Sequence, residues 1–239
     1  MKPLTLEYGK RIYEWWGRHP RLYRSLTWLV FLGREGTLRQ RAAMLASVGS
    51  GDTVLDLGCG SGANFGAIEA RIGDQGRLIG LDYSPGMLRA AEALAAARGW
   101  RNVELMQGDA ARMELPSASI DASVCTLALS AMPDHRAAIE CVHEALRPGA
   151  RFAVLDAREF DGAGRLLNPV IRPAFRVTTN WDPGKDLGAS LRDTFDAVEV
   201  QRFNAGSMFI AVARRLERET TGYDPETTSE SEQGPRPHG

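Results

Sequence analysis

The chain has few of the features that mark a secreted, disulfide-stabilised or membrane-spanning protein. Its 239 residues include three cysteines, Cys59, Cys125 and Cys141, with no C-x-x-C spacing, so neither a disulfide framework nor a zinc site is expected. No signal-peptide pattern opens the sequence, and the apolar run at 26–32 (LTWLVFL) is too short to span a bilayer. The formal net charge of −1 gives no general attraction to nucleic acid. We therefore expect a cytoplasmic protein with no metal and no nucleic-acid partner; no pattern in the sequence predicts its oligomeric state.

Three regions of the chain differ in composition. Residues 1–46 are basic and aromatic, hold three of the five tryptophans, and are predicted to be helical at 6–18 and 22–32. Residues 47–215 alternate strand-like and helix-like signals. Residues 216–239 are polar, acidic and proline-bearing, so they are predicted to form a disordered tail.

The middle region predicts a Rossmann-like α/β fold. Short apolar runs predict strands at 53–57, 77–82, 102–106, 121–127 and 151–156, and helices separate them. One helix begins at the Ser84-Pro85 pair and ends at Gly99, and another begins after Asp134 and ends at Pro148-Gly149. Two further runs, 197–203 and 207–215, flank a turn and predict a hairpin. We expect a seven-stranded, mostly parallel sheet with helices on both faces and a C-terminal antiparallel hairpin.

Chemistry-bearing residues follow each of the first four predicted strands. Ligands of open α/β sheets bind beyond the carboxyl ends of the strands, where these residues converge. Glycines let the backbone turn sharply close to a ligand, and an acidic residue about twenty positions later suits the two hydroxyls of a ribose. The strand ends carry, in order, Gly58, Gly60 and Gly62; Asp82; Asp109 and Ala110; and the segment from Thr126 to Ser130. Together they predict a nucleoside-binding cleft.

The glycine loop alone fits more than one ligand. The stretch GCGSGA (58–63) matches the dinucleotide fingerprint if Ala63 takes its third position, so a nicotinamide-dependent oxidoreductase is an alternative. Tight strand-to-helix turns also need glycine for structural reasons, and Asp82 and Asp109 could each be an ordinary helix cap. Asp56, two residues before the first glycine, suits a cationic ligand and would repel a pyrophosphate. With Asp82 and Asp109 it predicts an acidic cleft, and the terminal hairpin is not expected of a dinucleotide fold.

Four stretches resemble the successive motifs of class I S-adenosylmethionine-dependent methyltransferases: VLDLGCGSG, GLDYSPGMLRAAE, GDAARMELPSASIDASVCTLALSAMPD and LRPGARFAVLDA. The resemblance covers residues 38–158, and the predicted hairpin agrees by position. The branch it resembles contains ubiquinone- and menaquinone-biosynthesis C-methyltransferases and small phospholipid N-methyltransferases. It implies S-adenosylmethionine as cofactor and S-adenosylhomocysteine as product.

The resemblance also implies roles for single residues. Gly58, Cys59, Gly60 and Gly62 would form the loop around the methionine part of the cofactor, and Asp56 would hold its amino group, directly or through water. The remaining implied contacts are Asp82 to the ribose, Tyr83 and Met87 beside the adenine, Asp109 and Ala110 at the adenine edge, and Thr126 and Leu127 near the sulfonium.

No residue pattern predicts a catalytic base. His19, Tyr13, Tyr23 and His135 are the candidates, each with a structural alternative such as packing or a helix surface. Residues 1–46 are expected to form a helical lid over the substrate, and 160–184, rich in proline and glycine, an insertion on the acceptor side. The basic and aromatic mixture of 1–46 also fits peripheral contact with an anionic membrane.

The expected reaction is in-line methyl transfer to a hydrophobic small molecule, either a quinol, a lipid or a natural product. The methylated atom, carbon, nitrogen or oxygen, stays open. The alternatives are a nicotinamide-dependent oxidoreductase and a catalytically silent subunit that only binds the cofactor.

Overall fold

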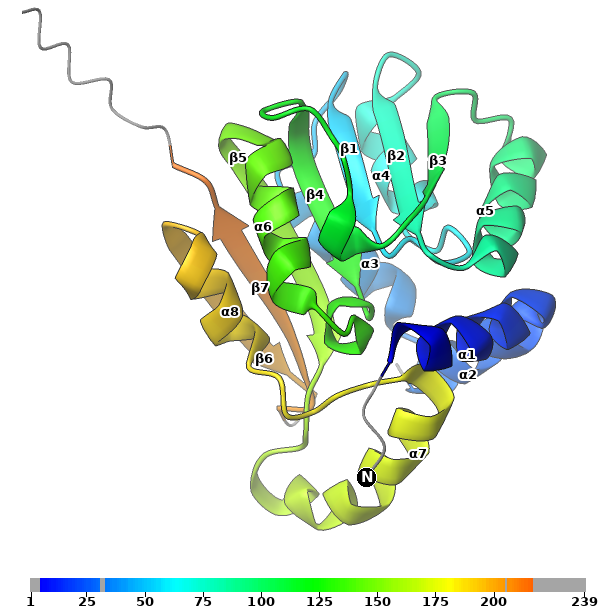
Figure 1. Cartoon of the computed structure of the whole chain (residues 1–239), viewed down its shortest axis with the longest axis vertical. Helices are drawn as coiled ribbons and strands as arrows, with labels where there is room; N and C mark the ends of the chain where they lie inside the picture. The colour runs from blue at the N-terminus through cyan, green and yellow to red at the C-terminus, as the bar shows by residue number, and fades with distance from the viewer. Residues whose placement is uncertain (1–4, 31–32, 205, 217–239) are drawn as a thin grey trace, which may run out of the picture.

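A single seven-stranded sheet forms the centre of the molecule (Figure 1). The computed structural model describes residues 5–30, 33–204 and 206–216. The strand order is β3-β2-β1-β4-β5-β7-β6, and β7 runs opposite to the other six strands. The strands are β1 (Thr53–Leu57), β2 (Arg77–Asp82), β3 (Val103–Gln107), β4 (Ile120–Thr126), β5 (Leu146–Ala157), β6 (Ala197–Phe203) and β7 (Met208–Arg214). The predicted Rossmann-like fold with a terminal antiparallel hairpin is confirmed.

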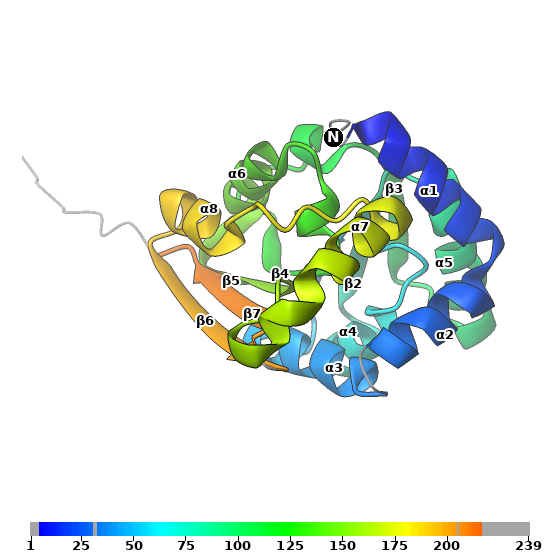
Figure 2. The ribbon, with the colours of Figure 1, turned by 90° about the horizontal axis from the view of Figure 1, so that it is seen from below.

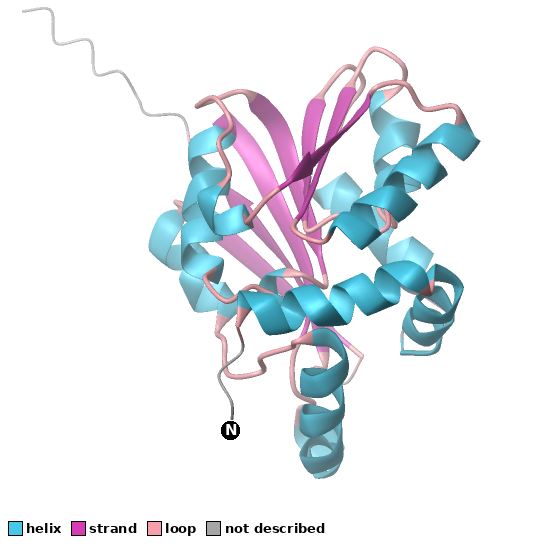
Figure 3. Cartoon of the chain, turned by 45° about the vertical axis from the view of Figure 1, so that its right-hand side comes forward, coloured by secondary structure: helices cyan, strands magenta, loops and turns pink. Residues whose placement is uncertain are grey.

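Helices cover both faces of the sheet (Figure 3). The elements are α1 (Leu6–Arg18), α2 (Pro20–Val30), α3 (Glu35–Leu45), α4 (Phe65–Ile72), α5 (Pro85–Arg98), α6 (His135–Ala145), α7 (Asn168–Thr179) and α8 (Leu187–Thr194), with 3-10 turns η1 (Ala110–Arg112), η2 (Leu129–Ala131) and η3 (Gly162–Leu167). One buried cluster packs α6 and α8 on the sheet, and a second packs α3, α4 and α5 on the opposite face. None of the helices in the described part of the chain is long and apolar enough to cross a membrane.

Local capping signals place the helices that flank the site. Ser84 accepts a hydrogen bond from the backbone N–H of Met87, Pro85 opens α5, and Gly99 ends it at φ 72°. Asp134 caps α6 in the same way, through the N–H of Ala137. These starts and the α5 end agree with the sequence, since a cap depends on residues only a few positions apart.

Some predicted boundaries are wrong. α6 ends at Ala145 and β5 begins at Leu146, so Pro148-Gly149 lies inside the strand rather than at the helix end. Leu146 pairs with Ile120 of β4, and the Gly149 N–H donates to the Arg215 carbonyl, so pairing across the sheet extends the strand. β3 and β4 are each displaced by one residue from the predicted ranges.

The terminal segments differ in part from the expectation. α1 matches 6–18, whereas the second predicted helix spans Pro20–Val30 and residues 31–32 lie outside the described residues. The sequence did not predict α3. The 160–184 insertion contains η3 and α7; Pro169 stands in the first helical turn, where proline is favourable, and Pro173 lies inside the helix despite the hydrogen bond it removes. Residues 217–239 of the predicted tail lie outside the described residues.

Seen from the carboxyl ends of the strands, α7 lies across the middle of the molecule and α1 runs along its rim beside α5 (Figure 2). Three aromatic side chains of α1 donate hydrogen bonds to the last carbonyls of α7: Tyr8 Oη to Val177 at 3.4 Å, Trp16 Nε1 to Thr178 at 2.8 Å, and Tyr13 Oη to Thr179 at 2.9 Å. The final carbonyls of a helix have no partner within it, so these donors cap α7. The two helices, distant in the sequence, thus form one cover over the sheet edge.

Candidate functional site

The loop after β1 turns back against the end of β2. The backbone N–H groups of Gly58 and Cys59 both donate to the Leu81 carbonyl, at 2.8 and 3.0 Å. Gly62 has φ 82°, and a Cβ there would lie 2.8 Å from Cδ2 of Phe65. Only glycine fits this position, both for its left-handed backbone and for the close approach of the Phe65 ring.

Asp82, the last residue of β2, holds this loop in place and borders the cavity beside it. Its Oδ2 accepts from the Gly60 N–H at 2.9 Å, and its Oδ1 accepts from the Ser84 N–H at 2.8 Å. Burial raises the pKa of Asp82 to about 6, although these bonds oppose the rise. Each carboxylate oxygen keeps a lone pair. The side chain can therefore hold the loop and still accept hydrogen bonds from a ligand.

A cavity beside this loop, here called the first cavity, is lined by most of the residues predicted to bind the cofactor. Those that line it are Gly58, Cys59, Gly60, Asp82, Tyr83, Met87, Asp109, Ala110, Thr126 and Leu127. Asp109 also caps η1 through the Ala111 N–H, so its capping role and its position at the cavity coexist. Asp56 and Gly62 do not belong to the lining.

Asp56 lies fully buried behind the loop rather than at the cavity wall. Asn64 Nδ2 donates to its Oδ1 at 2.7 Å, and its Oδ2 has no hydrogen-bond partner. Burial raises the pKa of Asp56 to about 7, with the Asn64 bond and the nearby Arg39 charge acting against the rise. Asp56 is not part of the lining of the first cavity, and its expected contact with a cofactor amino group, directly or through water, stays a prediction.

Arg39 of α3 is a lining residue that the sequence reasoning missed. Its guanidinium donates to Asn64 Oδ1 at 2.8 Å and to the Thr126 hydroxyl, and it pairs with Glu35 at 2.8 Å. The side chain is 8% exposed and borders the first cavity. The cleft is therefore not uniformly acidic, because a cation stands beside its carboxylates. Arg39 was one arginine among many in a basic segment, and only the fold distinguishes it.

A second cavity of about 620 Å³ adjoins the first and is mainly apolar. Tyr13, Tyr23, Leu127 and Ala131 line both spaces. Leu127 adopts φ 57°, a conformation that costs free energy for a residue other than glycine and is concentrated at functional sites. The other lining residues are Leu26, Thr27, Ser130, Asp156, Ala157, Arg158, Phe160, Ile171, Phe175, Thr179, Trp181, Asn204, Ser207 and Met208.

The four candidate bases occupy different places. Tyr13 and Tyr23 stand where the two cavities meet, and burial raises the pKa of each, that of Tyr23 to about 12. Both phenols therefore stay protonated near neutral pH and can donate hydrogen bonds. His19 stacks on Trp15 at an exposed turn, and His135 contacts the Ser190 hydroxyl at 3.0 Å. Neither histidine lines either cavity.

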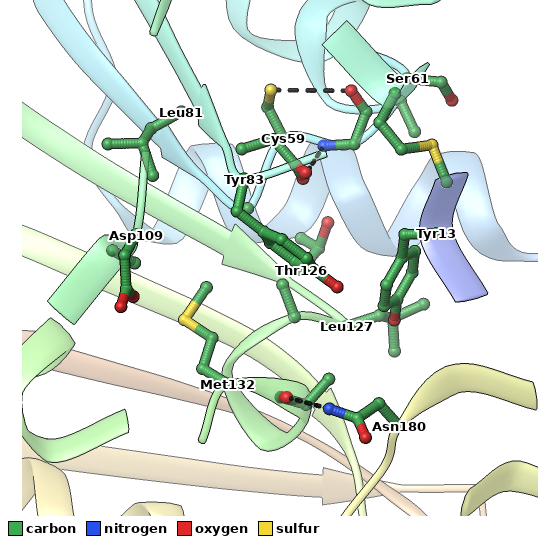
Figure 4. A pocket seen from close by; sticks show the side chains of 18 of the residues that line it. Tyr13, Cys59, Ser61, Leu81, Tyr83, Asp109, Thr126, Leu127, Met132 and Asn180 are labelled. Carbon is green, nitrogen blue, oxygen red and sulfur yellow. Dashed lines mark hydrogen bonds between the residues drawn. The ribbon is translucent and has the colours of Figure 1, made fainter. Parts of the chain in front are cut away.

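The first cavity fits a nucleoside that carries an amino acid. The buried Asp82 carboxylate borders it, the Arg39 guanidinium offers a partner for a carboxylate, and a glycine loop allows close approach. Tyr83 (Figure 4) and Met87 also line this cavity and add apolar surface to it. Within the described residues, no cluster of His, Cys, Asp or Glu has the arrangement of a metal site.

Comparison with known proteins gives a consistent result. A family model described as "Methyltransferase domain" matches residues 54–149. The chain is 28% identical over 174 residues to 2-phytyl-1,4-beta-naphthoquinone methyltransferase of Arabidopsis thaliana, covering 69% of this chain and 66% of that protein. It is 36% identical over 124 residues to aklanonic acid methyltransferase DauC of Streptomyces sp. (strain C5), covering 52% and 56%. It thus spans between about half and two thirds of these two relatives.

Solved structures show the same fold. A SAM-dependent methyltransferase from Aquifex aeolicus superposes with a TM-score of 0.58 at 20% identity, covering 74% of this chain and 89% of that one. At this identity the similarity shows the fold alone. The glycine loop and the carboxylates at the strand ends are the features that indicate the cofactor.

Proposed function

We propose that this chain, which belongs to the class I S-adenosylmethionine-dependent methyltransferases, transfers a methyl group to a hydrophobic small molecule. The observation that carries the proposal is the meeting of two cavities at Tyr13, Tyr23, Leu127 and Ala131. One cavity has the charged groups and glycine loop that suit the cofactor, and the other has the apolar walls that suit an acceptor.

S-adenosylmethionine supplies a methyl group bonded to a positively charged sulfur. Asp82 would accept hydrogen bonds from the ribose hydroxyls, and Tyr83 and Met87 would flank the adenine. Asp109 and Ala110 would meet the adenine edge. Arg39 would pair with the carboxylate of the methionine part, a role for which its burial beside Thr126 and Asn64 is the support.

The chain's own contribution would be alignment and exclusion of water. A methyl group on a sulfonium is already activated, and holding two reactants in line contributes roughly 7–11 kcal/mol to lowering a barrier. The four residues that line both cavities, Leu127, Ala131, Tyr13 and Tyr23, would fix the direction of approach. The α1–α7 cover would keep water from the reacting atoms.

The walls of the second cavity support an acceptor with a large apolar surface. Phe160, Ile171, Phe175 and Trp181 line it, and the Trp181 indole donates to the Ala157 carbonyl at 3.2 Å, which fixes one wall. The names of two relatives mention a naphthoquinone and aklanonic acid. A quinol, a lipid or a polycyclic natural product are all compatible with such walls.

Calorimetry with S-adenosylmethionine and with NAD tests the cofactor. We expect binding of the first and none of the second; binding of NAD alone would overturn the cofactor assignment and favour the oxidoreductase alternative. Release of S-adenosylhomocysteine with quinol, lipid-amine and polyphenol acceptors tests turnover. Cofactor binding with no turnover on any acceptor class would favour a silent subunit.

We further propose peripheral contact of residues 1–46 with an anionic membrane. In this segment Trp15, Leu22 and Trp28 are 48%, 52% and 60% exposed, among basic neighbours. The double variant Trp15→Ser/Trp28→Ser should lose co-sedimentation with phosphatidylglycerol vesicles, whereas Leu216→Ser, at an exposed site at the end of β7, should not. Equal sedimentation of all three proteins would remove the membrane proposal.

A further inference from the structure

Two buried polar side chains form a pair at the ends of neighbouring strands. Ser130 belongs to η2, directly after β4, and Asp156 is the penultimate residue of β5. The Ser130 hydroxyl donates to Asp156 Oδ1 at 2.7 Å, and the Ser130 N–H donates to Oδ2 at 2.9 Å. The Ala157 N–H adds a third bond, to Oδ1 at 2.7 Å. The residues are only 4% and 1% exposed, so the pair is held rigidly.

The pair belongs to the second cavity. Both residues line it, in a wall that is otherwise largely apolar. Ala131, the next residue after Ser130, lines both cavities. The hydroxyl and carboxylate therefore stand close to the place where the acceptor would meet the cofactor.

The hydrogen-bond capacity of Ser130 is already divided. A serine hydroxyl has one proton and two lone pairs. Because its proton is used on Asp156, Ser130 Oγ can serve a molecule in the cavity only as an acceptor. A ligand that donates a hydrogen bond is thus favoured at this point, and one that presents only an ether oxygen is disfavoured.

We propose that the Ser130–Asp156 pair is the recognition site for an ionisable hydroxyl, a phenol or an enol, on the methyl acceptor, and that Asp156 receives its proton. This inference rests on the proposed function. The acceptor O–H bond breaks and its proton passes to Ser130 Oγ, while the Ser130 hydroxyl proton passes to Asp156 Oδ1. The bonding electron pair stays on the acceptor oxygen, which becomes the nucleophile directly or through its conjugated ring. Asp156 later releases the proton to water.

The charged neighbours of the pair are compatible with this role. Burial raises the pKa of Asp156, which brings it nearer to that of a phenol and makes it a better proton acceptor. Lys185 Nζ donates to the Ser130 carbonyl at 3.0 Å and attracts the carboxylate. Tyr13 of α1 and Cys125 of β4 also interact with Asp156, and Arg158 lines the cavity while pairing with Asp161 at 3.1 Å.

Binding of 4-nitro-1-naphthol and of its methyl ether to the full chain tests recognition. The wild type should bind the naphthol roughly tenfold more tightly than the ether, because only the naphthol can donate a hydrogen bond to Ser130 Oγ, which is itself bonded to the Asp156 carboxylate. Ser130→Ala should remove this preference and leave the ether affinity unchanged. Ser207→Ala is a matched control, because Ser207 lines the same cavity but donates to the Asn204 carbonyl; it should keep the preference.

Visible absorbance of the bound naphthol tests the proton transfer. One pH unit below the pKa of the free ligand, the wild-type complex should show more of the naphtholate band than the free ligand does, because Asp156 takes a share of the proton. Asp156→Asn should bind the ligand without that increase in the band. Ser130→Ala should also lose the increase, and because it still binds the ether it shows that the loss does not come from unfolding. Equal affinities for naphthol and ether, or no more of the band in the wild type than in the free ligand, would overturn the inference while leaving the cavity as an acceptor site. Failure of both ligands to bind would overturn the acceptor cavity itself.

Discussion

Replacing Asp56 with asparagine should change how stability depends on pH. Asp56 is fully buried, with one oxygen bonded to Asn64 and the other unpaired. Burial raises its pKa to about 7 in the folded protein, whereas an unfolded aspartate titrates near pH ~3.9. The folded state therefore keeps a proton that the unfolded state releases, and stability is lost as the pH rises toward the folded pKa. Above that pKa both states are ionised and the loss levels off.

The magnitude follows from the difference between the two pKa values. Each unit corresponds to about 1.4 kcal/mol, so ionised Asp56 costs about 4 kcal/mol in total. Between about pH 5 and pH 8 the linkage relation gives a loss of roughly 2–3 kcal/mol from this one side chain. Asparagine keeps the shape and the oxygen that accepts from Asn64 but carries no charge, so the variant should not show this part of the decline.

Urea unfolding followed by tryptophan fluorescence measures the effect. Between the two pH values the wild type should lose roughly 2–3 kcal/mol more unfolding free energy than Asp56→Asn. Asp82, whose pKa is raised to about 6, is present in both proteins, so the difference between them reports Asp56 together with its interaction with Asp82. Asp193→Asn, at an exposed site paired with Arg136, should behave like the wild type. If wild type and Asp56→Asn decline in parallel, Asp56 is ionised throughout and the account of its burial is wrong.

Three further changes test other parts of the structure. Arg39→Gln should weaken S-adenosylmethionine binding by about 2–3 kcal/mol, the worth of a charge-assisted bond, yet leave binding of methylthioadenosine, which has no carboxylate, unchanged; calorimetry with both ligands decides. Gly62→Ala should lose at least about 1–2 kcal/mol of stability because of its left-handed backbone and the Phe65 contact, measured by thermal unfolding against Gly99→Ala, where φ is also positive but nothing lies near the added methyl group. Trp16→Phe keeps an aromatic ring but removes the indole donor to Thr178, so hydrogen exchange in α7 should speed up by roughly fivefold, for a bond of about 1 kcal/mol; unchanged exchange would mean that the bond does not hold the cover.

Sequence patterns predicted the elements whose signals are local. β1, the glycine turn and the start and end of α5 depend on residues a few positions apart, and all stand where they were expected. The end of α6 was misplaced because strand pairing of Leu146 with Ile120 outweighs the Pro148-Gly149 signal. Local propensity is a weak guide wherever partners come from elsewhere in the chain.

The candidate site also has one part that local sequence signals predict and another that depends on contacts between distant segments. The glycines and Asp82 follow from their place after strands, whereas Arg39 meets Asn64 and Thr126 across 25 and 87 residues. No spacing rule connects a helix in the basic segment with a strand end so far along the chain. The same holds for the wall that α7 provides, since the prolines of its sequence indicate an irregular segment and only contact with α1 shows why a helix is retained.

The hydrogen bonds between α1 and α7 end on backbone carbonyls, at residues 177, 178 and 179. Every amino acid carries that oxygen, so the attachment places no demand on which side chains α7 displays. Ile171 and Phe175, which face the second cavity, are thus free to vary without loosening the cover. Such a chain can exchange one acceptor for another through substitutions in a single helix, and divergence of substrate range within a lineage would be expected to concentrate there while the aromatic donors of α1 persist.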